Sequence, residues 1–275
     1  MNVRSGPELS EPLRLALGRY LTTVADDELV IGYRDSEWTA AAPMVEEDVA
    51  FSSLAQDEIG HARLYYTLAG ELLGEDPDRL ALLRPEDQYW HAPVLEEPAA
   101  PRYDPSGNHR AGGSWAKAVV RRYLYDLFDD LRTELLLAVR YPPLTGAVEK
   151  IRREEQYHLR HGAAWFEMLG NGAGDAHERL QTALSDSWPG LLGLFEPPKG
   201  EAALIDAGVV PGSWNLLRDG WLGLVRDRCR ASGLHLPETG VEPETGGRLG
   251  VHGSGWVELY HDMTMVRRLE PDAAW

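Results

Sequence analysis

The sequence predicts an all-α protein: a four-helix bundle with a long crossover between its second and third helices and a helical C-terminal extension. Apolar residues recur every three or four positions from residue 8 to about residue 169, and no alternating run predicts a strand. Proline and glycine gather between these periodic segments. We therefore expect one domain over residues 1–275, with the bundle at 8–170 and the extension at 171–275.

Capping residues and helix breakers set the expected bounds of the bundle helices. Ser10 can cap the first helix, Pro43 suits the first turn of the second, and Gly74 ends the second. The third is expected to begin near Ser114 and to stop before Pro142. The four predicted helices are residues 10 to about 33, 43–74, 114 to about 140, and 144–169.

The crossover and the C-terminal extension are less regular. The crossover, from about residue 85 to 113, is rich in proline, and we expect it to be the most flexible segment. A fifth amphipathic segment, residues 175–195, is interrupted by Pro189, and a helix near 214–231 and a last short helix follow. Four glycines between these last helices are interpreted as a flexible loop: Gly247, Gly250, Gly253 and Gly255.

Composition excludes several classes of function. Forty-four Asp and Glu against 27 Lys and Arg give a formal charge of -17, which repels a nucleic-acid backbone where no basic cluster is present. The single cysteine, Cys229, cannot form an internal disulfide or a thiolate metal site, as is typical of a reducing compartment. No window approaches the roughly 18 apolar residues of a membrane span, and the N-terminus lacks a signal-peptide core. We expect a cytoplasmic protein that binds neither nucleic acid nor membrane.

A duplicated motif carries the strongest chemical signal: DEIGH at 57–61 and EEQYH at 154–158. Residues three apart project from one face of a helix, so the Glu and His of each copy can bind one ion. Either copy alone is more often a solvated ion pair. Both copies, however, lie on the apolar stripes of their helices, where an unpaired carboxylate costs several kcal/mol, so burial requires a counter-charge.

An acidic residue precedes each motif on the neighbouring helix at a similar distance. Glu28 lies 30 positions before Glu58, and Asp126 lies 29 positions before Glu155. Three other acids on the third helix compete with Asp126, at separations of 26, 25 and 21 from Glu155: Asp129, Asp130 and Glu134. Asp126 is the acid whose separation from Glu155 best matches the separation of Glu28 from Glu58. The predicted metal ligands are therefore Glu28, Glu58, His61, Asp126, Glu155 and His158.

Four carboxylates and two imidazoles suit a pair of iron ions, with manganese as the alternative, better than zinc. Asp57 and Glu154 precede the ligand glutamates, where each can accept a hydrogen bond from a ligand imidazole across the bundle. The alternative is that both are exposed acids on a helix flank. The other histidines lack a partner at ligand spacing and are interpreted as structural: His91, His109, His161, His177, His235, His252 and His261.

Several segments resemble the ring 1,2-phenylacetyl-CoA epoxygenase family: AQDEIGHARLYY, KIRREEQYHLRHG, the GNG turn, GGRLGVH, and HDMTMVRRLEP with a terminal Trp. The length and tail resemble the C-type component of that complex, whereas the two motifs resemble its catalytic, di-iron A-type component. Known C-type components lack several ligands, including the Glu and His of the first motif, and act as structural partners. Here all six positions are filled, which puts a purely structural role in doubt.

The resemblance implies a ferritin-like fold and a monooxygenase that uses O2 to epoxidise the aromatic ring of phenylacetyl-CoA. It implies two partners, a separate iron-sulfur flavin reductase and an A-type subunit, hence a hetero-oligomer, with a homo-oligomer as the alternative. Two other functions stay open: a structural subunit without metal or with residual metal, and a ferroxidase-type bundle. The chain contains no P-loop or dinucleotide glycine fingerprint, and its sequence offers no obvious anchor for the CoA substrate.

Overall fold

The computed structural model describes residues 9–98, 100–103, 109–110, 113–238 and 240–271. Four long helices dominate it: α1 (Glu11–Ser36), α2 (Val45–Leu73), α5 (Trp115–Leu137) and α6 (Pro142–Gly170). The shorter helices are α3 (Pro77–Leu82), α4 (Pro93–Glu96), α7 (Ala176–Leu192), α8 (Glu201–Asp206), α9 (Leu217–Ala231) and α10 (Ser254–Leu269). Among the described residues, no helix combines the length and the apolar character that crossing a bilayer requires.

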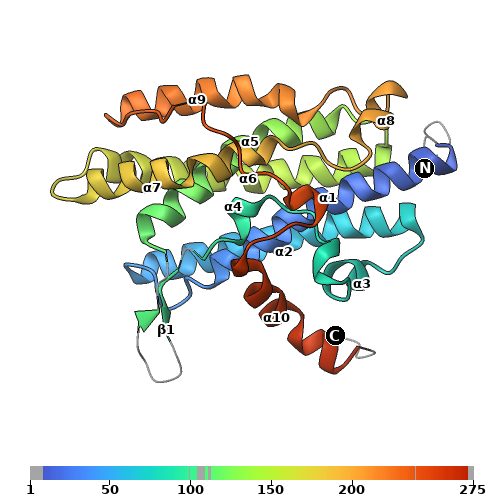
Figure 1. Ribbon diagram of the computed structural model, residues 1–275, viewed down its shortest axis with the longest axis horizontal. Coiled ribbons are helices and arrows are strands. Elements are labelled where there is room, and N and C mark those ends of the chain that lie inside the picture. Colours follow the sequence, from blue (N-terminus) through green and yellow to red (C-terminus); the bar gives the residue numbers. More distant parts are fainter. Residues whose placement is uncertain (1–8, 99, 104–108, 111–112, 239, 272–275) are drawn as a thin grey trace.

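The four long helices pack as two hairpins. α1 packs along α2, α5 packs along α6, and contacts between α2 and α6 join the pairs. α7 and α9 cover the α5–α6 hairpin, whereas α3 and α10 lie against α1, as Figure 1 shows. The predicted all-α bundle with a long crossover and a helical extension is therefore confirmed.

Helix ends follow the local chemistry with three corrections. Ser10 occupies the N-cap position of α1, but its side chain makes no capping hydrogen bond. Gly74 ends α2 in the left-handed conformation (φ 75°), and the Ser114 hydroxyl accepts a hydrogen bond from the Lys117 amide at 3.2 Å. Pro43 precedes α2 rather than lying in its first turn, since α2 begins at Val45. Pro189 lies inside α7 and does not interrupt it: the helix continues to Leu192, although proline has no N–H to donate to the carbonyl four residues earlier.

The described part of the crossover is packed, contrary to the flexibility expected of it. It contains α4, a 3-10 turn (Glu86–Gln88) and an antiparallel ladder of β1 (Arg102–Tyr103) with β2 (His109–Arg110). Tyr89 and Leu95 are fully buried in the core. Residues 99, 104–108 and 111–112 of this segment, and the side chain of His109, lie outside the described part. The sequence missed this packing because irregular segments have no periodicity to show which residues are buried.

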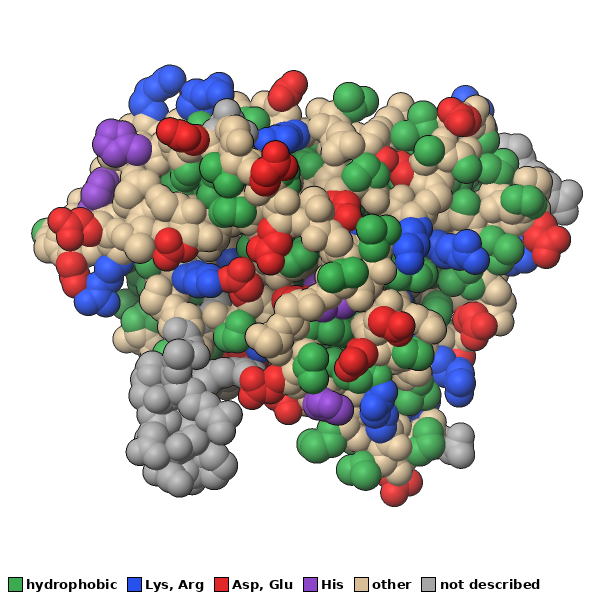
Figure 2. Space-filling view, viewed as in Figure 1, with side chains coloured by type: hydrophobic (Ala, Val, Ile, Leu, Met, Phe, Trp, Pro, Cys, Tyr) green, Lys and Arg blue, Asp and Glu red, His purple; other side chains and the backbone are tan. Residues whose placement is uncertain are grey.

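The glycine-rich loop before α10 is also packed closely, which the sequence did not predict. A Cβ on Gly247 would lie 2.1 Å from the His91 carbonyl oxygen, so only glycine fits there. Arg248, next to it, is fully buried and places Nη2 2.9 Å from Asp27 Oδ2 on α1. The loop therefore ties the C-terminal extension to the bundle. On the visible surface, acidic and basic side chains are interspersed and no single basic patch forms (Figure 2).

Candidate metal centre

The four long helices bring the six predicted ligands together in the bundle interior. On α2 and α6 the three-residue spacing places each Glu and His on the same buried face. The six residues, each at most 1% exposed, are Glu28 on α1, Glu58 and His61 on α2, Asp126 on α5, and Glu155 and His158 on α6.

Candidate ligand atoms of these residues form two groups, and within each group the atoms lie within 4.8 Å of one another. One group contains one ligand atom each from Glu28, Glu58 and His61, and the other contains Glu58 with Asp126, Glu155 and His158. Glu58 belongs to both groups, so the two groups adjoin in one site.

Each imidazole faces the carboxylates of both motifs. His61 Nδ1 lies 3.2 Å from Glu155 Oε1 and 3.6 Å from Glu58 Oε2. His158 Nδ1 lies 3.2 Å from both Glu58 Oε1 and Glu155 Oε1. The Nδ1 atoms therefore point to the space between the two helical hairpins, which is where a shared pair of cations would bind.

The opposite edge of each imidazole contacts an acid on the other hairpin. His61 Nε2 lies 2.9 Å from Glu154 Oε2, and His158 Nε2 lies 3.3 Å from Asp57 Oδ2. Donation of the Nε2 proton to these carboxylates fixes the tautomer and leaves Nδ1 as the nitrogen that can bind a cation. The side chains of Asp57 and Glu154 are 39% and 35% exposed, so both lie at the edge of the site.

Buried polar atoms without a hydrogen bond converge on the same point. They include both carboxylate oxygens of Glu58 and of Glu155, one oxygen each of Glu28 and Asp126, and Nδ1 of His61 and His158. Native proteins leave few buried polar atoms unsatisfied, because each costs about 1–3 kcal/mol. A pair of divalent cations would satisfy this set, so the residues present fit such a group.

Two arginines from α5, which the sequence analysis did not predict, also enter the site. Arg122 places Nη2 2.5 Å from Glu58 Oε1 and donates from Nε to Asp126 Oδ1 at 2.6 Å. Arg132 pairs with Glu28 and donates from Nε to Asp129 Oδ1 at 2.7 Å. The sequence signal for them is weak: each arginine lies three or four residues from an acid of α5, but this spacing does not show that both members of the pair are buried. These guanidiniums are alternative counter-charges for the carboxylates.

The pKa shifts of the histidines and of Glu28 show that this site favours added positive charge. Burial opposes protonation of the two imidazoles, yet the neighbouring carboxylates, Glu155 first, raise the pKa of His61 to about 10 and that of His158 to about 12. Burial, followed by the charges of Asp129 and Glu58, raises the pKa of Glu28 well above its usual range. Without a cation, the site therefore holds protons that a cation would replace.

The competing acids of α5 divide into two kinds. Asp129 is fully buried and pairs with Arg132, and burial raises its pKa to about 6. Asp130 lies near the surface with its carboxylate 3.4 Å from Arg152, and Glu134 is exposed. Asp126 is the α5 acid that the structure groups with Glu58, Glu155 and His158.

A third group joins His91 and His252 through Glu96. Glu96 Oε2 lies 2.8 Å from His91 Nε2 and 3.0 Å from His252 Nδ1. The two rings stack, with centroids 4.2 Å apart and planes at 11°. One ion cannot lie in the planes of two stacked parallel rings, so we interpret this group as a hydrogen-bonded link between the crossover and the C-terminal loop.

Comparisons with known proteins agree with the motifs. Residues 6–275 match the protein family described as phenylacetic acid catabolic protein. The chain is 29% identical to the C-type component of 1,2-phenylacetyl-CoA epoxidase from Escherichia coli (strain K12) over 260 residues, which cover 94% of this chain and 99% of that relative. It is 25% identical to the A-type component of the same enzyme over 189 residues, 69% of this chain and 57% of that relative.

Proposed function

The chain belongs to the phenylacetic acid catabolic protein family, and on this premise we propose that it is a metal-binding subunit of a multicomponent monooxygenase that epoxidises the aromatic ring of phenylacetyl-CoA. Its similarity to two components of the E. coli epoxidase supports a role in phenylacetate catabolism within a hetero-oligomer. The observation that carries the proposal is the convergence of buried carboxylates from four helices and two imidazoles, with several of their polar atoms lacking a hydrogen bond.

We propose iron as the metal, with manganese as the alternative, held by Glu28, Glu58, His61, Asp126, Glu155 and His158. A reduced iron pair, when bound, supplies the electrons and the O2 activation that ring epoxidation needs. Glu58 and Glu155 each face both imidazoles, so these two carboxylates would hold the metal together with the histidines. Asp57 and Glu154 orient the histidines, and the near-complete burial of the ligands excludes bulk water.

A second candidate function is that of a structural subunit, which the arginines favour. Arg122 and Arg132 already neutralise carboxylates of the site, which a bundle without metal requires. An exposed apolar surface along α10 also suits a protein that is covered by a partner: Val257, Met265, Val266 and Leu269. Under either function, the partner that we propose is an A-type subunit, and the catalytic function also needs a reductase.

Metal analysis of the full chain from iron-replete cells tests the proposal. We expect two irons per chain, and we expect Glu58→Ala or His158→Ala to abolish stoichiometric iron while the helical content of the chain persists. Glu71→Gln, on the exposed face of α2, is the matched control and should keep both irons. A folded wild-type chain without iron or manganese would refute the metal centre and favour the structural function. Turnover of phenylacetyl-CoA with the reductase, with and without an A-type partner, then shows whether this chain performs the chemistry.

A further inference from the structure

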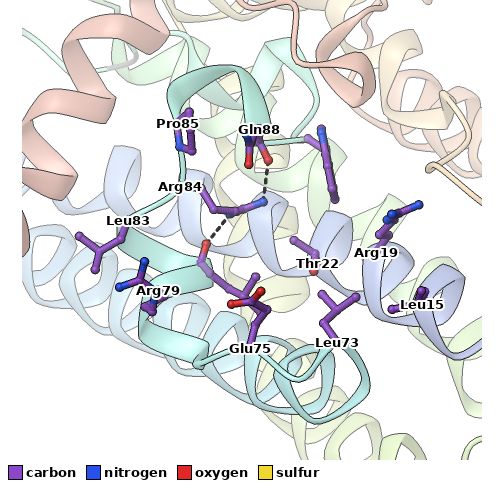
Figure 3. Close-up of a pocket in the computed structure, with 12 residues that line it drawn as sticks. Leu15, Arg19, Thr22, Leu73, Glu75, Arg79, Leu83, Arg84, Pro85 and Gln88 are labelled. Atoms are coloured by element: carbon purple, nitrogen blue, oxygen red, sulfur yellow. Dashed lines mark hydrogen bonds between the residues drawn. The ribbon is translucent and has the colours of Figure 1, made fainter. Parts of the chain in front are cut away.

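A hollow of about 500 Å³ lies between α1, the end of α2, α3 and the segment that follows α3 (Figure 3). Arg19 from α1 and Arg79 from α3 stand on opposite sides of it. We call it the arginine hollow. It lies outside the metal centre, because it contains none of the six candidate ligands.

The two arginines are available to a ligand. Both are exposed, and neither makes an ion pair or a side-chain hydrogen bond with another described residue. Arg84, the third arginine of the hollow, is already paired with Asp26 and donates to the Gln88 carbonyl oxygen at 2.7 Å. Apart from the Arg84–Asp26 pair, the charged side chains that line the hollow are these two arginines and Glu75, so a net positive charge remains there in a chain with a formal charge of -17. The planar forks of the two guanidiniums suit phosphate oxygens.

The rest of the lining is mixed and includes an indole ring. Thr22, Gln88 and the carboxylate of Glu75 are polar, and the remaining side chains are apolar. Leucines line much of the hollow, and Trp90 is half-buried beside them. Lys199 places Nζ 4.9 Å from the centroid of the Trp90 ring, which adds a cation next to a flat aromatic surface. A base can stack on such a ring while its phosphates bind the neighbouring cations. This combination suits a phosphorylated nucleotide better than a simple carboxylate.

The hollow and the metal centre both include residues of α1. Arg19 is nine residues before Glu28 on the same helix, which corresponds to roughly 13 Å along the helix axis. A smaller, mostly apolar hollow of about 160 Å³ is lined by residues that neighbour the candidate ligands in the sequence, among them Leu29, Ile59 and Ala62. It is also lined by Tyr66, whose hydroxyl lies 3.3 Å from Nη2 of Arg84 in the arginine hollow. The anionic nucleotide end of a larger ligand is the part that matches the arginine hollow.

We infer that the arginine hollow binds the phosphorylated nucleotide end of an acyl-CoA thioester, with Arg19 and Arg79 contacting its phosphates. This inference rests on the proposed function, since it supplies the binding site for the acyl-CoA substrate in this chain. Calorimetric titration of the purified full chain with coenzyme A tests it. We expect Arg19→Glu/Arg79→Glu to weaken binding roughly tenfold or more, because each charge-assisted contact contributes a factor of this order.

A matched control changes the net charge equally at a different place. Arg226→Glu/Arg230→Glu alters two exposed arginines on α9 and should leave the affinity for coenzyme A within twofold of the wild-type value. The milder double variant Arg19→Gln/Arg79→Gln removes the two charges without reversing them, so it is less prone to unfold. It should still weaken binding. Equal weakening by the α9 pair, or no weakening by the Arg19 and Arg79 pairs, would overturn the inference. No detectable binding of coenzyme A to the wild-type chain would also overturn it.

Two further probes separate coenzyme A from other phosphate compounds. Dephospho-coenzyme A, which lacks the 3′-phosphate, should bind more weakly than coenzyme A, and inorganic pyrophosphate should bind more weakly still. Equal affinities for all three would show a general anion site and contradict the inference. The outcomes are distinct from those of the metal analysis. A chain that binds coenzyme A through Arg19 and Arg79 but takes up no metal would refute the metal centre alone, and an iron-loaded chain without this binding would refute the arginine hollow alone.

Discussion

His158 Nε2 lies 3.3 Å from Asp57 Oδ2, so the acid that precedes one candidate ligand glutamate contacts the histidine of the opposite motif. His61 and Glu154 repeat the relationship at 2.9 Å. The two copies of the motif therefore hold each other's imidazoles, and the site depends on the alignment of both hairpins.

We predict that Asp57→Asn and Glu154→Gln each lower metal affinity by roughly 10- to 100-fold without unfolding the chain, because each removes the acceptor that orients a ligand imidazole. Competition with a chelator, followed by metal analysis, measures the affinity. The control Glu71→Gln should bind metal like the wild-type chain. Unchanged affinity in both variants would show that the acids are only surface charges.

Arg122→Gln should lower the free energy of unfolding of the metal-free chain by about 3–5 kcal/mol, because it leaves buried carboxylates without their counter-charge. Added Mn²⁺ should then raise the unfolding temperature of this variant more than that of the wild-type chain, since the cation replaces the lost guanidinium. Thermal unfolding with and without Mn²⁺ provides the test. Arg226→Gln on α9 is the exposed control. Equal shifts in variant and wild type would argue against cation binding by Glu58 and Asp126.

Stability should rise with pH between about pH 4 and 6.5 because of His91. Burial lowers the pKa of His91 to about 4, whereas an unfolded histidine has a pKa of about 6.5. In this interval the unfolded chain binds a proton that the folded chain does not, so lowering the pH favours unfolding. Urea unfolding across this range should show a weaker pH dependence for His91→Asn than for the wild-type chain. The same dependence in both would contradict the assignment.

We predict that Gly250→Ala destabilises the chain by roughly 1–3 kcal/mol. Gly250 has φ 82°, and a Cβ there would lie 2.0 Å from the Asp87 carbonyl oxygen. Gly223→Ala on α9 is the control, since a Cβ there meets nothing within 4 Å and its φ is helical. Chemical denaturation of both variants measures the difference. A loss of similar size in the two variants would contradict the close packing of this loop.

We propose that residues 1–275 form a single domain, which predicts that a chain ending at Gly170 will not fold cooperatively. Trp214 Nε1 donates to the Tyr20 hydroxyl at 2.7 Å, and Trp221 Nε1 donates to the Leu124 carbonyl oxygen at 2.9 Å, so the extension completes the core of the bundle. Thermal unfolding followed by near-ultraviolet circular dichroism should show no sharp transition for the fragment. A cooperative transition would show that residues 8–170 are an independent domain.

The helices and the position of the candidate ligands could be predicted from the sequence because both depend on spacing along one helix. The three-residue step from Glu58 to His61, and its repeat at Glu155 and His158, places four side chains on buried faces without any knowledge of tertiary contacts. The separation of Glu28 from Glu58 is similar to that of Asp126 from Glu155, and this similarity indicates which acids the two remaining helices contribute.

The counter-charges could not be predicted in the same way. A buried carboxylate requires a positive partner, but spacing does not show whether that partner is a metal ion or an arginine such as Arg122. Arg248 meets Asp27 across 221 positions, and helical periodicity contains no information about such a pair. For the same reason, the arginine hollow is visible only after α3 has been placed against α1.

The pairing of Asp27 with Arg248 also bears on how the protein is made. Asp27 leaves the ribosome 221 residues before the arginine that neutralises it, so a nascent chain carries the carboxylates of α1 well before the loop that covers them is synthesised. The order of synthesis thus leaves Asp27 without this guanidinium partner until nearly the whole polypeptide has been made, so the carboxylate can be buried with its full set of partners only at a late stage of folding.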